Sequence, residues 1–219
     1  MIPYLSIKDD FPPVKNALQE HNGLLAAGGD LSPKRLLSAY CQGIFPWFNE
    51  DQPILWFAPD PRMVLFPQDF KCSHSLKKKI KKSNYEIRVN TQFQAVMQAC
   101  ATTPRAGQNG TWIHHEMIQA YYQLHQLGYA YSVETWQNDQ LIGGLYGIRL
   151  GSVFFGESMF SHETDASKLA FAFLIQKLAP QWQIQIIDCQ MYTKHLASLG
   201  ATLVPLSILQ DYLYESILF

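Results

Sequence analysis

The segment YAYSVETWQNDQLIGGLYGIRLGSVFFGE, residues 129–157, decides the fold of this chain. It holds three strand-like runs, at 129–136, 141–150 and 153–157. Asn138-Asp139 and Gly151 lie between the runs and suit tight turns. Short runs joined by such turns predict three consecutive antiparallel strands.

Helical patterns precede and follow these strands. The segment 165–178 is apolar almost all round, which predicts a helix buried against the sheet. Thr91 is expected to cap another helix, in which Phe93, Val96 and Cys100 recur at helical spacing. Further helices are predicted at 75–82, 113–127 and 191–199, and further strands at 85–89, 184–188 and 201–205. Antiparallel strands with helices before and between them predict a mixed α/β (α+β) fold.

The first part of the chain has a different character. It is rich in Pro, Gly and Trp, and only one helix is clearly indicated, with Ser32 as N-cap, Pro33 at the first position and Gly43 after the end. We therefore expect a small irregular N-terminal domain at residues 1–62 and a larger domain at residues 63–219.

Composition limits the classes of function. The chain is 47% hydrophobic and has a formal net charge of −1, so any nucleic-acid contact must come from a local basic patch. Its four cysteines form no CxxC pair, which favours a reducing compartment. The N-terminus lacks a signal-peptide pattern, and no apolar run approaches the ~20 residues that span a bilayer. We expect a cytoplasmic protein.

Charged and aromatic residues suggest a polyanionic partner. Five lysines crowd about two helical turns: Lys77, Lys78, Lys79, Lys81 and Lys82. They form either a solvated helix face or a contact for phosphates, which Arg62, Arg88 and Arg105 could extend. Tryptophans in loops are usually core residues, but close to a basic patch they could stack on a nucleobase. The tryptophans concerned are Trp47, Trp56 and Trp112.

Polar residues at two strand ends are candidates for chemistry. Glu157 enters an apolar region, where a lone carboxylate is costly, so it is either paired with a cation or functional. Asp188 and Gln190 are two residues apart on a strand, so they should share a face and could accept N–H bonds from an amine. Asp188 also suits the N-cap of the next helix, and Cys189 should point away as a packing residue.

Two other chemistries are poorly supported. Ser158 has no adjacent base, which argues against a serine hydrolase. His114-His115-Glu116 lacks the HExxH spacing, so no metal site is expected.

Taken together, these features resemble the bacterial leucyl/phenylalanyl-tRNA–protein transferase family. The matching runs follow the family's order along most of the chain: 23–26, 28–33, 43–48, 59–62, 110–113, 156–161, 166–168, 188–190 and 197–201. The resemblance implies a small N-terminal domain and an acetyltransferase-like (GNAT) domain, with a mixed, largely antiparallel sheet flanked by helices.

The same resemblance implies an aminoacyltransferase. The enzyme would move Leu or Phe from charged tRNA to the α-amino group of proteins with N-terminal Arg or Lys, tagging them for N-degron degradation. GNAT enzymes that use acetyl-CoA need a Gln/Arg-x-x-Gly-x-Gly/Ala loop, and the sequence has none. We therefore expect no cofactor and a different acyl carrier. Two alternatives stay open, a small-molecule GNAT-type N-acyltransferase and a non-catalytic tRNA-binding module.

The resemblance also implies site residues. Glu157, Asp188 and Gln190 would be catalytic, and Trp47 and Trp112 would bind the 3′-terminal adenosine. The five lysines would contact the tRNA acceptor stem. The pocket for the aminoacyl side chain would be lined by Leu145, Phe154, Gly156, Met159, Phe171, Leu174 and Ile187.

Gln190 has two possible roles. The family is described with Asp188 polarising Gln190, which then draws a proton from the acceptor amine. A carboxamide is a very weak base, and the pKa of an α-amino group is about 7.7–8.0, so part of the amine is neutral at pH 7. We therefore favour positioning and desolvation of the amine by Asp188 and Gln190.

Overall fold

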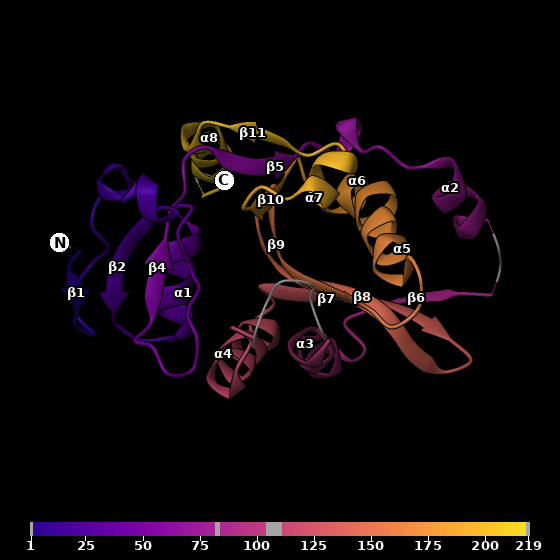
Figure 1. Cartoon of the computed structure of the whole chain (residues 1–219), viewed down its shortest axis with the longest axis horizontal. Coiled ribbons are helices and arrows are strands. Elements are labelled where there is room, and N and C mark those ends of the chain that lie inside the picture. The colour runs from indigo at the N-terminus through magenta and orange to yellow at the C-terminus, as the bar shows by residue number, and fades with distance from the viewer. Residues whose placement is uncertain (1, 82–83, 104–110, 218–219) are drawn as a thin grey trace.

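The computed structural model describes residues 2–81, 84–103 and 111–217. Within these residues the strands form a four-stranded sheet near the N-terminus and a seven-stranded sheet in the rest of the chain, with helices on both faces of the larger sheet (Figure 1). The predicted mixed α/β class is confirmed. The boundary predicted between residues 62 and 63 stays a prediction.

The smaller sheet is built from very short strands. In spatial order they are β1 (Tyr4–Leu5), β2 (Leu24–Gly28), β4 (Leu55–Phe57) and β3 (Phe45–Pro46). The helix α1 (Pro33–Tyr40) follows β2, and the Ser32 side chain caps it by accepting the backbone N–H of Arg35, as predicted. Because strands of two to five residues show no readable period, the sequence did not reveal this sheet. Single 3-10 turns occur at η1 (Val14–Asn16), η2 (Gln19–His21) and η3 (Pro67–Asp69).

The larger sheet carries the candidate site. Its strands, in spatial order, are β11 (Thr202–Val204), β5 (Arg62–Leu65), β10 (Ile186–Gln190), β9 (Val153–Ser161), β8 (Gln140–Leu150), β7 (Ala130–Gln137) and β6 (Glu86–Val89). Pairing is antiparallel except between β9 and β10, which are parallel. The largely antiparallel sheet and its three consecutive central strands are confirmed. Since β9 continues to Ser161, Glu157 lies inside a strand and not at its end.

Helices cover both faces of the larger sheet (Figure 1). On one face, α3 (Phe93–Thr102), α4 (His115–Gln126) and α8 (Leu206–Ile217) share a hydrophobic core with Phe155 of β9. On the other face, α5 (Ala166–Phe173), the π-helical segment η4 (Leu174–Leu178) and α6 (Ala179–Trp182) share a core with Phe154 and Ile187. The two remaining short helices are α2 (His74–Ile80), which packs on α5, and α7 (Lys194–Ser198). The predicted buried helix is confirmed.

The start of α3 differs from the prediction. Thr91 does not cap the helix, because the residue before α3 is Gln92. The buried carboxylate of Glu134, on β7, accepts the backbone N–H groups of Thr91 and Gln92 at 2.9 and 2.8 Å, and the Thr91 hydroxyl also donates to it. A carboxylate from another strand thus holds the backbone just before the helix, where the sequence had suggested a local cap.

Among the described residues, no helix is both long and apolar enough to cross a membrane.

Candidate active site

A cavity of about 520 Å³ opens beside β9 and β10. Its walls include all seven residues predicted for the aminoacyl pocket, Leu145, Phe154, Gly156, Met159, Phe171, Leu174 and Ile187. Leu174 begins the π-helical segment, a rare element that often occurs at functional sites. The volume lies in the usual range for ligand sites, so the cavity can hold a large apolar side chain with room for polar groups beside it.

The cavity lies where β9 and β10 separate. Their parallel pairing ends with Asp188 opposite Phe155. Just beyond, the register of each strand shifts against its other neighbour, at Glu157 on β9 and at Cys189 on β10. Bulges of this kind redirect side chains and are frequent next to active sites. Here they bring polar side chains from both strands to the edge of an apolar cavity.

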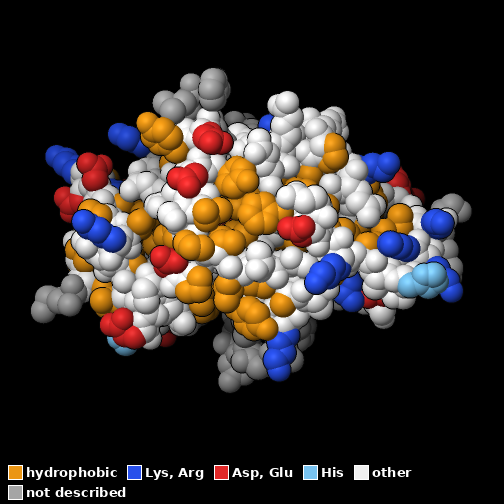
Figure 2. Space-filling model, turned by 90° about the horizontal axis from the view of Figure 1, so that it is seen from above, with side chains coloured by type: hydrophobic (Ala, Val, Ile, Leu, Met, Phe, Trp, Pro, Cys, Tyr) orange, Lys and Arg blue, Asp and Glu red, His pale blue; other side chains and the backbone are white. Residues whose placement is uncertain are grey.

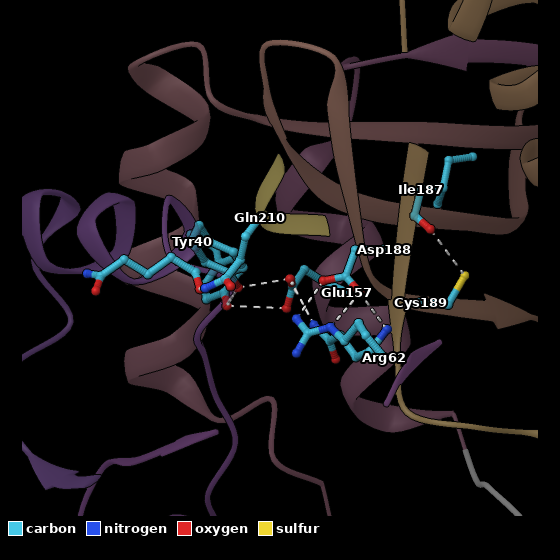
Figure 3. A network of polar contacts seen from close by, with 10 residues as sticks. Tyr40, Arg62, Glu157, Ile187, Asp188, Cys189 and Gln210 are labelled. Carbon is cyan, nitrogen blue, oxygen red and sulfur yellow. Dashed lines mark hydrogen bonds and ion pairs between the residues drawn. The ribbon is translucent and has the colours of Figure 1, made fainter. Parts of the chain in front are cut away.

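Glu157 is the centre of a hydrogen-bond network (Figure 3). Its carboxylate accepts the Tyr40 hydroxyl at 2.8 Å, the Tyr121 hydroxyl at 3.3 Å and the Gln190 side-chain amide at 3.2 Å. The hydroxyls of Tyr40 and Tyr121 also contact each other. The donors come from α1, α4 and β10, so three separate elements fix one carboxylate that is only 7% exposed.

This environment sets the proton affinity of Glu157. Burial raises the pKa of its carboxyl most, the Tyr40 hydrogen bond lowers it, and the negative charge of Asp188 raises it, giving a pKa of about 7. Burial also raises the pKa values of Tyr40 and Tyr121 well above their usual range, so both hydroxyls keep their protons and act as donors. Glu157 is therefore a carboxyl group that gains and loses its proton near neutral pH.

Asp188 is held in a buried ion pair instead of lining the cavity. Its two carboxylate oxygens accept Nε and Nη2 of Arg62 at 2.8 and 2.6 Å, and both side chains are fully buried. The same carboxylate accepts the backbone N–H of Gln190 at 2.9 Å, and Gln190 has a left-handed backbone with φ +61°. That conformation is costly for a residue other than glycine, so Asp188 helps to hold Gln190 in place.

The bulge changes which β10 side chains face the cavity. Two residues apart on a regular strand, Asp188 and Gln190 were expected to share a face, with Cys189 pointing away. Cys189 and Gln190 both line the cavity, whereas Asp188 does not. Burial, and then the charge of Asp188, raises the pKa of the Cys189 thiol, which therefore keeps its proton. A thiol that keeps its proton is a poor nucleophile.

The tryptophans fall into two groups. Trp56 is fully buried in β4 and donates its indole N–H to the Gly28 carbonyl at 2.8 Å, so it is a core residue. Trp47 and Trp112 are half-buried, and the Trp47 ring lies 5.5 Å from that of Phe57. Neither lines the cavity beside β9, and their contact with adenosine stays a prediction.

The lysine helix is confirmed as α2. Lys77, Lys78 and Lys81 are exposed, whereas Lys79 pairs with Asp165 at 2.8 Å. Lys82 lies outside the described residues. Seen from above (Figure 2), basic side chains gather toward the end of the molecule where α2 lies.

Two of the three arginines, Arg62 and Arg88, do not extend this patch as expected. Arg62 is buried against Asp188, and Arg88 pairs with Glu86 and Asp139 at 2.7 and 3.0 Å. Arg105 lies outside the described residues.

No group of three or more His, Cys, Asp and Glu side chains is placed to hold a metal ion in the part of the chain that the structure describes.

Sequence reasoning missed Tyr40, Tyr121 and the role of Arg62. Both tyrosines occupy the apolar faces of amphipathic helices, where they read as core residues. Arg62 read as a surface cation. One signal was available: Glu157 and Asp188 are carboxylates in apolar strands, and each requires donors or a cation from elsewhere in the chain.

Comparisons with known proteins agree with these observations. A family model described as "Leucyl/phenylalanyl-tRNA protein transferase" matches residues 64–214, and a second, for the N-terminal domain of the same transferase, matches residues 29–60. Curated relatives called leucyl/phenylalanyl-tRNA–protein transferase include one from Nitrosospira multiformis, 59% identical over 94% of this chain and 88% of the relative. Another, from Chromobacterium violaceum, is 55% identical over 99% of this chain and 92% of the relative.

Solved structures resemble the chain only distantly. A GCN5-related N-acetyltransferase from Kribbella flavida has a TM-score of 0.38 and 10% identity, and covers 78% of this chain and 60% of its own. L-PGS from Bacillus licheniformis has a TM-score of 0.41 and 9% identity, and covers 82% and 59%. With both TM-scores below 0.5, the fold rests on its own strand order. The family models and the relatives nevertheless show that the chain belongs to the leucyl/phenylalanyl-tRNA–protein transferase family, and so to the aminoacyltransferases.

Proposed function

We propose that the protein moves leucine or phenylalanine from charged tRNA to the α-amino group of an acceptor protein, with the aminoacyl side chain in the cavity beside β9. One observation carries this proposal. The cavity is apolar along α5, β8 and β9 and becomes polar at Glu157 and Gln190, which suits an apolar side chain whose ester lies at the polar end.

The transfer requires little chemical activation by the protein. An aminoacyl ester is already activated, so holding it next to a neutral amine supplies much of the rate. Gln190 can accept an N–H of the amine through its side-chain oxygen, because its Nε2 already donates to Glu157. Asp188 does not contact the amine in this proposal; its carboxylate accepts the backbone N–H of Gln190 and so holds Gln190 in position.

We further propose that acceptors begin with Arg or Lys and that the transfer marks them for N-degron degradation, as the family resemblance implies. Charged tRNA and such acceptors meet in the cytoplasm, which is where we place the reaction. Trp47 and Trp112 would bind the terminal adenosine, and the exposed lysines of α2 would contact acceptor-stem phosphates. The N-terminal domain would end at residue 62.

The test is a transfer assay. The protein is incubated with leucyl-tRNA labelled on leucine and a peptide that starts with Arg, with and without ribonuclease. We expect label on the peptide, its loss after ribonuclease, and no reaction with a peptide whose α-amino group is acetylated. Transfer from acyl-CoA alone would instead indicate a small-molecule N-acyltransferase, and tRNA binding without transfer would indicate a binding module.

A further inference from the structure

The cavity holds a carboxylate, Glu157, beside the proposed binding group for the amine. Among the described residues that line the cavity, Glu157 is the one carboxylate, and it contacts Gln190 directly. An amine bound to the Gln190 side-chain oxygen would therefore lie beside a group that can take its proton.

We propose that Glu157 is the proton acceptor in the transfer, and that Tyr40 and Tyr121 are positioning residues that orient it. The proposal rests on the proposed function and adds to it the path of the proton. Gln190 is then a binding group for the amine and not a base, in keeping with the very weak basicity of a carboxamide.

The step balances with one carboxyl group. The acceptor nitrogen forms a bond to the ester carbonyl carbon and gives a proton to the Glu157 carboxylate. The tetrahedral intermediate then breaks its bond to the ribose oxygen, and that oxygen receives the proton from the Glu157 carboxyl. An amide and a ribose hydroxyl result, and the carboxylate is restored.

The surroundings of Glu157 suit this role. Tyr40 on α1 and Tyr121 on α4 donate to it, and Gln190 on β10 donates its amide. The charge of Asp188, also on β10, faces it and is paired with Arg62 of β5. The resulting pKa of about 7 lies close to that of an α-amino group, about 7.7–8.0, so the proton moves between groups of similar affinity.

His195 is the main competitor for this role, because it also lines the cavity. Partial burial, followed by the charge of Lys168, lowers the pKa of His195, which makes it the weaker base. It is also exposed and sits on α7, whereas Gln190 is hydrogen-bonded to Glu157.

The experiment measures kcat/KM for leucine transfer to an Arg peptide between pH 5.5 and 9. For the wild-type enzyme we expect the rate to rise with pH through two groups, one near pH 7 and the acceptor amine near pH 8. Glu157→Gln should lose about 10²–10⁴-fold and retain only the rise that belongs to the amine. Wild-type activity tests the proposed function separately, since its absence would refute the transfer reaction itself.

Tyr121→Phe provides a second readout that does not depend on the Gln variant folding. Losing a hydrogen bond that lowers the Glu157 pKa should move the rise near pH 7 to higher pH. Gln190→Ala should keep that rise, moved to higher pH because the Gln190 hydrogen bond also lowers the Glu157 pKa, and His195→Asn should keep it unmoved, whatever the rates of the two variants. Should Glu157→Gln keep it while Gln190→Ala or His195→Asn loses it, or should Tyr121→Phe leave its position unchanged, the assignment would be overturned.

Discussion

At the scale of single residues, Glu157 stands in an environment that favours its neutral form. Its pKa is about 7 in the folded protein against an ordinary value of 4.5. Between those two pH values the folded state binds more protons at this group than the unfolded state does. Stability from Glu157 therefore falls as pH rises from 4.5 to 7 and stays low above pH 7. The buried Glu157 carboxyl thus lowers the stability of the fold, and it titrates near neutral pH, where we expect the reaction to take place.

Glu157→Gln should consequently stabilise the fold at pH 8, by on the order of 3 kcal/mol, while the gain should be close to zero near pH 4.5. The measurement is urea unfolding of both proteins across this range. A difference in unfolding free energy between the two proteins that does not grow with pH would show that burial does not raise the pKa of the Glu157 carboxyl.

Substitution of the buried pair Arg62–Asp188 should destabilise the fold, in contrast to Glu157→Gln. Arg62→Met leaves a buried carboxylate without its cation, which should cost about 3–5 kcal/mol of unfolding free energy. Arg88→Met is the matched control, because the ion pairs of Arg88 are exposed and its loss should cost less than about 1 kcal/mol. Equal losses in denaturant unfolding would contradict the structural role of the buried pair.

At the scale of elements, the bulges of β9 and β10 create the site and also explain what the sequence could reveal. The seven residues that the family resemblance implied for the aminoacyl pocket all line one cavity, and their role in binding the aminoacyl side chain stays a prediction. The orientations of Asp188 and Cys189 were predicted wrongly. A bulge shifts the two-residue alternation of the strand, and nothing in the neighbouring sequence indicates the bulge. Tyr40 lies 117 residues from Glu157, and no pattern within one element reports such a contact.

Gly156 offers a test of the cavity wall. A Cβ at Gly156 would meet its nearest atom, the Asp188 carbonyl oxygen, at 3.5 Å, so alanine should fit and take volume from the cavity. We expect Gly156→Ala to reduce transfer of phenylalanine at least about 10-fold more than transfer of leucine. The measurement is the ratio of kcat/KM for the two charged tRNAs.

Gly147 supplies the contrast on the neighbouring strand. A Cβ there would lie 2.1 Å from the Phe155 carbonyl oxygen, which forces the backbone to shift. Gly147→Ala should lower the melting temperature, whereas Gly156→Ala should not. If the ratio of phenylalanine to leucine transfer is unchanged in Gly156→Ala, the side chain of the transferred amino acid does not bind beside Gly156.

At the scale of the whole molecule, charge is distributed unevenly around a chain of net charge −1. The exposed lysines of α2 lie at one end of the molecule, and the N-terminal sheet lies at the other (Figure 1). The proposed tRNA contact puts acceptor-stem phosphates at α2 and the aminoacylated end in the cavity.

Lys78→Ala should therefore weaken tRNA binding and reduce the slope of log affinity against log salt by about one. Lys15→Ala is the control, because Lys15 is also exposed but lies in the N-terminal region, and it should leave the slope unchanged. Binding is measured by filter retention or fluorescence between 50 and 200 mM salt. Equal slopes for all three proteins would remove α2 from the tRNA contact.

The most direct test of the account identifies the bond that the wild-type protein makes. An Arg peptide is incubated with equal amounts of leucyl-, phenylalanyl- and valyl-tRNA, and the products are read by mass spectrometry. We predict leucine and phenylalanine on the α-nitrogen, at least about 10-fold ahead of valine, and none after ribonuclease. Equal incorporation of valine, or acylation that survives ribonuclease, would contradict the assignment of this cavity as the aminoacyl pocket.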